Sequence, residues 1–163
     1  MYRFYKSSEY HSHQLKPRSS IEYIYFLSRK IMMLFKHRII YSKSRKINLL
    51  DYGCGNGDFI EYLSNKSFKV TGIEKSLLSQ KICRSKGLNV FSSVKLLGEA
   101  KFDVIMLWHV LEHVINPPKC IRTLSNFLTN DGSLIVAAPN IQSIDSQVFN
   151  CLLYTSPSPR DLT

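Results

Sequence analysis

The sequence predicts an α/β fold in which a doubly wound parallel sheet follows an N-terminal helical segment. Three observations lead to this prediction. Apolar runs of strand length alternate with helical patterns from residue 47 onward. The first run ends in glycines at alternate positions, Gly53, Gly55 and Gly57, as is typical of a strand-to-helix turn in such a sheet. The run 102–108 is apolar at six of its seven positions, as expected of a strand buried on both faces.

Local signals mark the ends of the other elements. Ser76 can cap a helix that Gly87 ends. Pro117 suits the first turn of a helix, and residues 130–132, Asn-Asp-Gly, are typical of a turn. Alternation of strands and helices implies right-handed crossovers and a ligand at the carboxyl ends of the strands. The expected strands cover residues 47–50, 68–73, 88–91, 102–108 and 133–138, and the expected helices cover 57–65, 76–86 and 117–128.

Residues 1–46 form a basic segment. They contain 11 Lys and Arg residues against two acids, a net charge of +9, whereas residues 47–163 contain 11 against 10, a net charge of +1. Apolar residues recur at helical spacing from 21 to 41, and Ser19 or Ser20 can cap this helix. Such a helix either packs on the domain, with its charged face in solvent, or contacts an anionic membrane surface. Because the charge is confined to this segment, it does not indicate that the ligand site binds nucleic acid.

The glycine turn differs from the dinucleotide pattern G-x-G-x-x-G. Its third glycine comes one residue early, and Asp58 stands in the expected position. Asp51 and Asp58 flank the turn with carboxylates, which would repel a pyrophosphate but suit a ligand with an ammonium and a sulfonium. Glu74 ends the second strand, 17 residues after Gly57, close to the spacing of a ribose-binding acid. The pattern D-x-G-x-G-x-G resembles motif I of the class I S-adenosylmethionine-dependent methyltransferases; the alternative is a structural turn with a surface acid.

Chemically active side chains are densest just after the run 102–108. His109, Glu112 and His113 lie within five residues, and a helical turn would place them on one face. Either histidine could act as a general base, and the set could also bind a metal. Each has a structural alternative: Trp108 as a core aromatic, Glu112 as a helix-entry acid, and His113 as a hydrogen-bonded structural histidine.

Four segments are similar to the ubiquinone-biosynthesis O-methyltransferase group of small-molecule methyltransferases, over about residues 47–150: LLDYGCGNGDF, VTGIE, FDVIMLWHVLEHVINP and GSLIVAAPNIQSID. The resemblance implies a Rossmann-like domain with five of the usual seven strands, and S-adenosyl-L-methionine as its cofactor. In that group the glycine loop cradles the methionine part, the acid after the second strand holds the ribose, and the residues after the third strand lie near the adenine. The implied cofactor-binding residues are Asp51, Gly53, Cys54, Gly55, Gly57, Glu74, Ser93, Val94 and Trp108.

The expected function is transfer of a methyl group to an oxygen or nitrogen nucleophile of a small molecule, in a step that the protein supports mainly by alignment. The expected catalytic residues are His109, Glu112 and His113, and either histidine would accept the proton of a hydroxyl acceptor. Some members of the group hold a metal through acid-x-x-Glu-His; here His109 replaces the first acid, so no metal is assigned. The alternatives are an NAD-type oxidoreductase and a nucleic-acid-directed methyltransferase that uses the basic segment.

The sequence also suggests a location in the cell. It has no run of 18 apolar residues, and its N-terminus lacks the layout of a secretory signal. Its four cysteines lack C-x-x-C spacing, which favours reduced thiols. We therefore expect a cytoplasmic protein.

Both ends of the chain carry signs of truncation. The segment FYKSSEYHSH and the basic helix after it resemble a bacterial subgroup of methyltransferases in which a further stretch comes first, so we expect Met1 to be internal. Residues 151–161 back-translate without conflict to DNA that resembles a transposon-type sequencing-library adapter. We therefore expect residues 151–163 to be a non-native tail and the domain 47–150 to continue naturally after Asn150.

Overall fold

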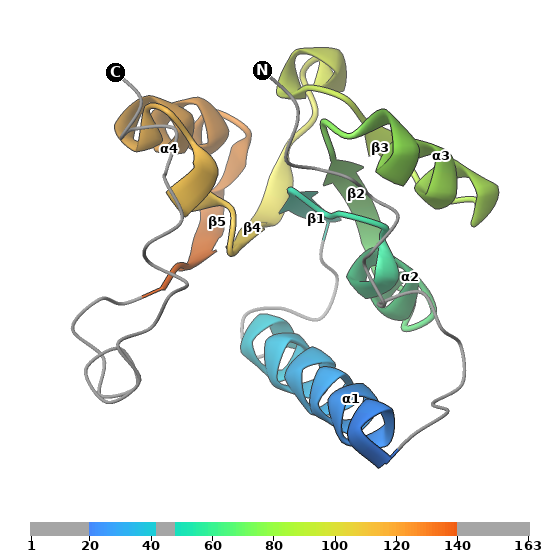
Figure 1. Ribbon diagram of the computed structural model, residues 1–163. Coiled ribbons are helices and arrows are strands. Elements are labelled where there is room, and N and C mark those ends of the chain that lie inside the picture. The colour runs from blue at the N-terminus through green and yellow to red at the C-terminus, as the bar shows by residue number, and fades with distance from the viewer. Residues whose placement is uncertain (1–19, 42–47, 140–163) are drawn as a thin grey trace. The chain divides into compact units, whose positions relative to one another are not determined.

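The computed structural model describes residues 20–41 and 48–139 (Figure 1). The chain divides into two units, residues 1–42 and 43–163, and each unit is considered by itself. The predictions for the two chain ends, including the non-native origin of the tail 151–163, lie outside the described residues.

The first unit contains one described helix, α1, Ser20–Tyr41. It confirms the helix predicted over residues 21–41, and no glycine or proline interrupts it. Residues four apart stack along it: the Lys30 ammonium lies 4.9 Å from the centre of the Phe26 ring, a pairing that supports a helix. No helix within the described ranges is both long and apolar enough to cross a bilayer.

The second unit is built on a five-stranded sheet in which every pairing is parallel. The strand order is β3-β2-β1-β4-β5, so the chain starts in the middle and builds first toward one edge, then toward the other. This confirms the predicted doubly wound α/β fold. The strands are β1 Asn48–Tyr52, β2 Lys69–Ile73, β3 Val90–Phe91, β4 Phe102–Trp108 and β5 Leu128–Ala137.

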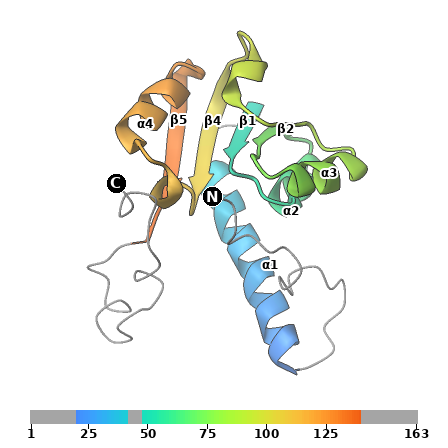
Figure 2. The same ribbon diagram turned by 45° about the horizontal axis from the view of Figure 1, so that its top comes forward.

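Three helices connect the strands, together with two short 3₁₀ turns. Figure 1 shows α2 and α3 beside β2 and β3, and Figure 2 shows α4 beside β5 at the other end of the sheet. Two predicted helix starts are present: Ser76 Oγ caps α3 by accepting from the Ser79 amide at 3.3 Å, and Pro117 is the first residue of α4. The helical elements are α2 Asp58–Ser64, α3 Leu77–Ser85, η2 Val94–Leu97, η3 Leu111–His113 and α4 Pro117–Ser125.

The boundary between α4 and β5 was predicted wrongly. The helix ends at Ser125, not at residue 128, and β5 already begins at Leu128. The predicted turn at 130–132 lies inside β5 as an irregularity: the register advances from Phe102↔Leu128 to Val104↔Ser133, so five positions of β5 match two of β4. The turn residues therefore form a bulge within β5, because β5 pairs with β4 both before and after them.

The core lies around β4, whose four central residues from Val104 to Leu107 are fully buried, as predicted. Burying one such side chain contributes about 1.5–3 kcal/mol, so this strand anchors the sheet. The loops that follow β1, β2 and β4 therefore start from rigid positions at one edge of the sheet. The buried cluster consists of Leu50, Ile73, Leu97, Phe102, Ile105, Leu107 and Leu124.

Candidate functional site

The glycine loop between β1 and α2 is attached to the end of β2. The amides of Gly53 and Cys54 both donate to the carbonyl oxygen of Ile73, at 2.7 and 3.1 Å. The amide of Gly57 closes the loop on the carbonyl of Cys54 at 3.1 Å, and Gly57 then caps α2 with a φ of 78°. The loop is therefore held at its start by the neighbouring strand and at its end by the helix.

The three glycines differ in what surrounds them. A Cβ atom on Gly53 would collide with Val110, and one on Gly57 would lie 2.9 Å from Cys83 Sγ. A Cβ atom on Gly55 would meet nothing within 4 Å. Gly55 is thus the point at which a ligand can approach the loop backbone closely. Packed side chains block such an approach at Gly53 and Gly57.

The structure brings Glu74 to this same glycine. Its Oε2 accepts from the Gly55 amide at 2.9 Å, and its Oε1 accepts from the Ser76 amide at 2.8 Å. The Glu74 amide donates to Phe91 O at 3.0 Å, which fixes the residue at the edge of the sheet. A carboxylate oxygen has room for two donors, so each oxygen of Glu74 keeps capacity for a ligand hydroxyl.

Asp51 of β1 and Cys54 of the glycine loop are both packed against β2. Asp51 is only 4% exposed, and β1 places it opposite Gly72 of β2. A Cβ atom on Gly72 would lie 2.7 Å from Cys54 Sγ, so the cysteine side chain packs toward the sheet. Burial raises the pKa of the Cys54 thiol, and the nearby carboxylate of Asp51 raises it further. Cys54 is therefore a neutral thiol at physiological pH, suited to packing and unsuited to act as a nucleophile.

A second loop follows β4 and begins at His109. The His109 amide donates to Ala137 O at 2.8 Å, and its backbone then turns left-handed with a φ of 54°. Such a conformation is uncommon outside glycine and is found often at functional sites. The Val110 side chain packs on Gly53, so this loop meets the glycine loop.

His109 and Glu112 form a loose pair. His109 Nδ1 lies 3.6 Å from Glu112 Oε1, and the histidine side chain is 63% exposed whereas that of Glu112 is 26% exposed. The Oε2 atom of Glu112 is buried, and no described residue gives it a hydrogen bond. This separation is beyond hydrogen-bond distance, so the two side chains interact through charge when the imidazole is protonated.

The helical turn that would place the three candidate catalytic residues on one face does not extend to all of them. Only residues 111–113 form a helical turn, and His109 precedes it with a left-handed backbone. The cause is the Ala137 bond, which extends the sheet pairing through His109 before the chain reverses. His113 is exposed, and within the described ranges no three His, Cys, Asp or Glu side chains are grouped as metal ligands.

The residues expected near an adenine or in a cleft wall occupy half-buried positions. Ser93 caps η2, with its hydroxyl accepting from the Lys95 amide at 3.3 Å. Val94 packs against the buried cluster of the sheet. Trp108 ends β4 opposite Ala137. Ser93 therefore follows β3 and Trp108 is the last residue of β4, whereas Val94 packs on the core.

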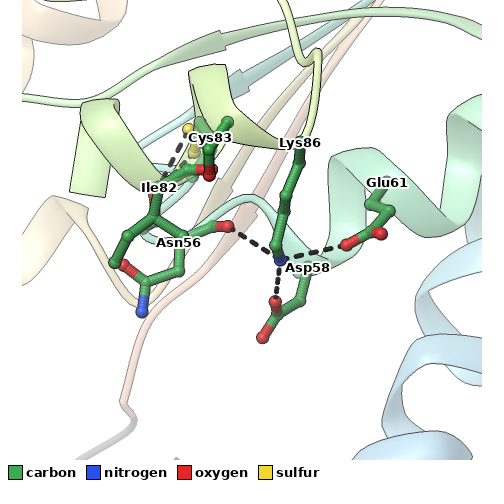
Figure 3. Close-up of polar contacts among 9 residues, drawn as sticks. Asn56, Asp58, Glu61, Ile82, Cys83 and Lys86 are labelled. Carbon is green, nitrogen blue, oxygen red and sulfur yellow. Dashed lines mark hydrogen bonds and ion pairs between the residues drawn. The ribbon is translucent and has the colours of Figure 1, made fainter. Parts of the chain in front are cut away.

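Sequence reasoning missed the residues of α3 and its C-cap that contact the glycine loop. Lys86 donates to the carbonyl oxygen of Asn56 and forms ion pairs with Asp58 and Glu61 (Figure 3). The buried amide of Gln80 donates to the Glu74 carbonyl at 2.8 Å. The available signal was the pair of acids at the start of α2, which requires a nearby cation, but the sequence alone does not show which of its lysines folds back to that point.

Comparison with known proteins gives a family match over most of the chain. A family model described as "Methyltransferase domain" matches residues 21–158. Among curated proteins, the ubiquinone biosynthesis O-methyltransferase of Caulobacter sp. (strain K31) is 33% identical over 104 residues, covering 58% of this chain and 41% of the relative. The protein of the same name from Pelagibacter ubique is 28% identical over 134 residues, covering 77% of this chain and 55% of the relative. The chain thus spans about half the length of the curated relatives it matches, or less.

Solved structures support the fold. A SAM-dependent methyltransferase from Archaeoglobus fulgidus has a TM-score of 0.62 at 24% identity, covering 85% of this chain and 70% of that one. The plantazolicin methyltransferase BpumL, solved with a monoazolic desmethylPZN analogue and SAH, has a TM-score of 0.59 at 21% identity, covering 79% of this chain and 51% of that one. Together with the family match, the glycine loop and the strand order lead to one conclusion: this chain belongs to the methyltransferase domain family.

Proposed function

We propose that this chain carries the cofactor-binding domain of an S-adenosyl-L-methionine-dependent enzyme that methylates an oxygen or nitrogen nucleophile of a small molecule. The observation that carries the proposal is the contact between the Glu74 carboxylate and the Gly55 amide, beside the open side of that glycine. Family membership and the names of the curated relatives support the same reaction, and those names favour an oxygen nucleophile.

The residues present fit this cofactor. Gly55 has open space beside its α-carbon, which a side chain at this position would occupy. Glu74 keeps acceptor capacity for the two hydroxyls of a ribose. Asp51 contributes a further carboxyl beneath the loop, which suits an ammonium group better than a phosphate. Residues of the glycine loop would hold the amino-acid part, and Glu74 would hold the ribose.

The bound cofactor supplies a methyl group that is already activated by its sulfonium. The chain's own task is to align the acceptor and remove its proton. The imidazole of His109 is 63% exposed in the loop after β4, so it is accessible to accept the proton of a hydroxyl acceptor. His113, exposed at the end of η3, is the alternative base.

The first experiment is a calorimetric titration of S-adenosylhomocysteine into the purified chain, with NAD as a control ligand. We expect S-adenosylhomocysteine alone to bind. Changing Glu74→Gln should weaken its binding by about 10- to 100-fold, because hydrogen bonds to charged groups contribute roughly 1.5–3 kcal/mol. The matched control is Glu99→Gln at an exposed position, which should change the affinity by less than about twofold.

The alternatives have distinct outcomes. Binding of NAD in place of S-adenosylhomocysteine would move the protein to the oxidoreductases. Unchanged affinity in both Asp51→Asn and Glu74→Gln would refute the site as drawn. A nucleic-acid acceptor would require binding that weakens steeply with salt.

Location and membrane contact stay predictions. We propose a cytoplasmic protein whose basic helix, residues 21–41, meets an anionic membrane surface if it does not pack on its own domain. Sedimentation of the chain with vesicles that contain anionic lipid tests this contact, which should disappear at high salt if it is electrostatic.

A further inference from the structure

Three side chains from α3 and its C-cap contact backbone carbonyl oxygens of the glycine loop and of Glu74 after β2. Gln80, Cys83 and Lys86 follow one another at three-residue intervals, so they share one side of the helical stretch. Each donates to a backbone carbonyl: Gln80 Nε2 to Glu74, Cys83 Sγ to Gly55 and Lys86 Nζ to Asn56, at 2.8, 3.3 and 3.3 Å. This side of α3 therefore holds both the glycine loop and the chain segment that carries Glu74.

Lys86 adds two ion pairs to its contact with the loop carbonyl. Its ammonium lies 2.8 Å from Asp58 Oδ1 and 3.0 Å from Glu61 Oε2, besides its bond to the Asn56 carbonyl (Figure 3). The Lys86 side chain is 28% exposed, so solvent screens these pairs only in part. Partial burial alone would lower the pKa of Lys86, but the hydrogen bonds to the two carboxylates outweigh it and raise the pKa. Lys86 is therefore fully charged at physiological pH.

The contact between Lys86 and Asn56 lies within the glycine loop itself. Asn56 lies between Gly55 and Gly57, which both have positive φ angles, 56° and 78°. Glycines lose more conformational freedom on ordering than other residues, so a free loop of this kind would be costly to order around a ligand. Glu74 accepts from the Gly55 amide, and Lys86 donates to the carbonyl of the following residue, Asn56.

We propose that Lys86 is a positioning residue of the cofactor site, which fixes the glycine loop against the start of α2 and so raises affinity for the cofactor. The role rests on the proposed function, and it acts through the loop rather than through contact with the reacting atoms. Lys86 also balances the charge of Asp58, the acid that stands where a dinucleotide site has its third glycine.

The test compares Lys86→Met with Lys81→Met. Lys81 is an exposed lysine in α3, so it matches the substitution without the loop contacts. We expect Lys86→Met to weaken binding of S-adenosylhomocysteine by about tenfold, and Lys81→Met to change it by less than about twofold. Lys86→Arg, which keeps the charge and a donor, should return the affinity to within about threefold of the wild type.

Amide hydrogen exchange of the ligand-free chain supplies a readout that does not depend on the proposed function. Lys86→Met should speed exchange in residues 53–57 by about tenfold and leave the core strand 102–108 unchanged. Faster exchange without any binding of S-adenosylhomocysteine to the wild type would refute the proposed function but keep the loop role. Two results would overturn the inference. One is loop exchange in Lys86→Met that equals that of the wild type. The other is equal affinity for S-adenosylhomocysteine in Lys86→Met and in a wild type that binds it.

A milder variant guards against loss of folding. Glu61→Gln removes one of the two ion pairs from a side chain that is 47% exposed. It should give a smaller change in the same direction in both measurements. If Lys86→Met does not fold, an unchanged loop in Glu61→Gln would still count against the role of this contact.

Discussion

The two loops that meet at the site are held very differently. The glycine loop is tied along its length, by Ile73 at its start, by Glu74 at Gly55 and by Lys86 at Asn56. The loop after β4 is attached through the amide of His109 and through the packing of Val110 and Leu111 on the core, while the His109 side chain is largely exposed. The difference teaches that the side of the site formed by the glycine loop is fixed by internal hydrogen bonds, whereas the side formed by the loop after β4 presents the His109 side chain to solvent.

The largest expected effect tests whether these two sides act separately. Changing His109→Ala should lower kcat by about 10²–10⁴-fold, the usual contribution of a general base. The affinity for S-adenosylhomocysteine should change by less than about twofold, because His109 is not part of the glycine loop. The measurements are methyl transfer to a panel of small phenols and amines, and calorimetry. Equal losses in rate and affinity would show that the two loops do not divide the work.

The next effect separates packing from ligand approach within the glycine loop. Gly57→Ala forces a left-handed alanine against Cys83, so we expect the free energy of unfolding to fall by about 2–4 kcal/mol. Gly55→Ala meets no neighbour and should cost only about 1–2 kcal/mol, from its backbone conformation. Urea unfolding measures both. Affinity for S-adenosylhomocysteine should nevertheless be lost in Gly55→Ala. Retained affinity would show that the ligand does not lie against the backbone of Gly55.

The smallest effect concerns the neutral thiol beneath the loop. Because burial raises the pKa of Cys54 above its ordinary value of 9.0, its contribution to stability is complete below pH 9 and is lost as the pH rises further. Between pH 9 and 10 the free energy of unfolding should fall more steeply in the wild type than in Cys54→Ala, by up to about 1.4 kcal/mol per pH unit. Urea unfolding at several pH values measures this slope, and equal slopes would place the thiol in contact with solvent.

Sequence patterns predicted the structure best where the residues within one strand or turn determine its conformation. The alternation of apolar runs and helical patterns was sufficient for the five parallel strands, and the glycine spacing located the turn after β1. Patterns failed at the end of α4, because residues 130–132 carry local turn chemistry while pairing with β4 draws them into a bulged strand. They also failed at His109, whose backbone is set by a hydrogen bond to Ala137, a residue 28 positions away.

The site shows the same division. Asp51, Gly55 and Glu74 could be selected from the sequence because each occupies a recognisable place at the end of a strand, where parallel strands bring ligand groups together. The contacts of Gln80 and Lys86 could not, because they depend on how α3 docks beside the glycine loop. Local sequence determined the strands, the glycine turn and the acid after β2, since short-range sterics and burial patterns act on neighbouring residues. Tertiary packing decided which lysine holds the loop, which glycine stays open and where His109 turns, since those contacts join residues that only the folded sheet brings together.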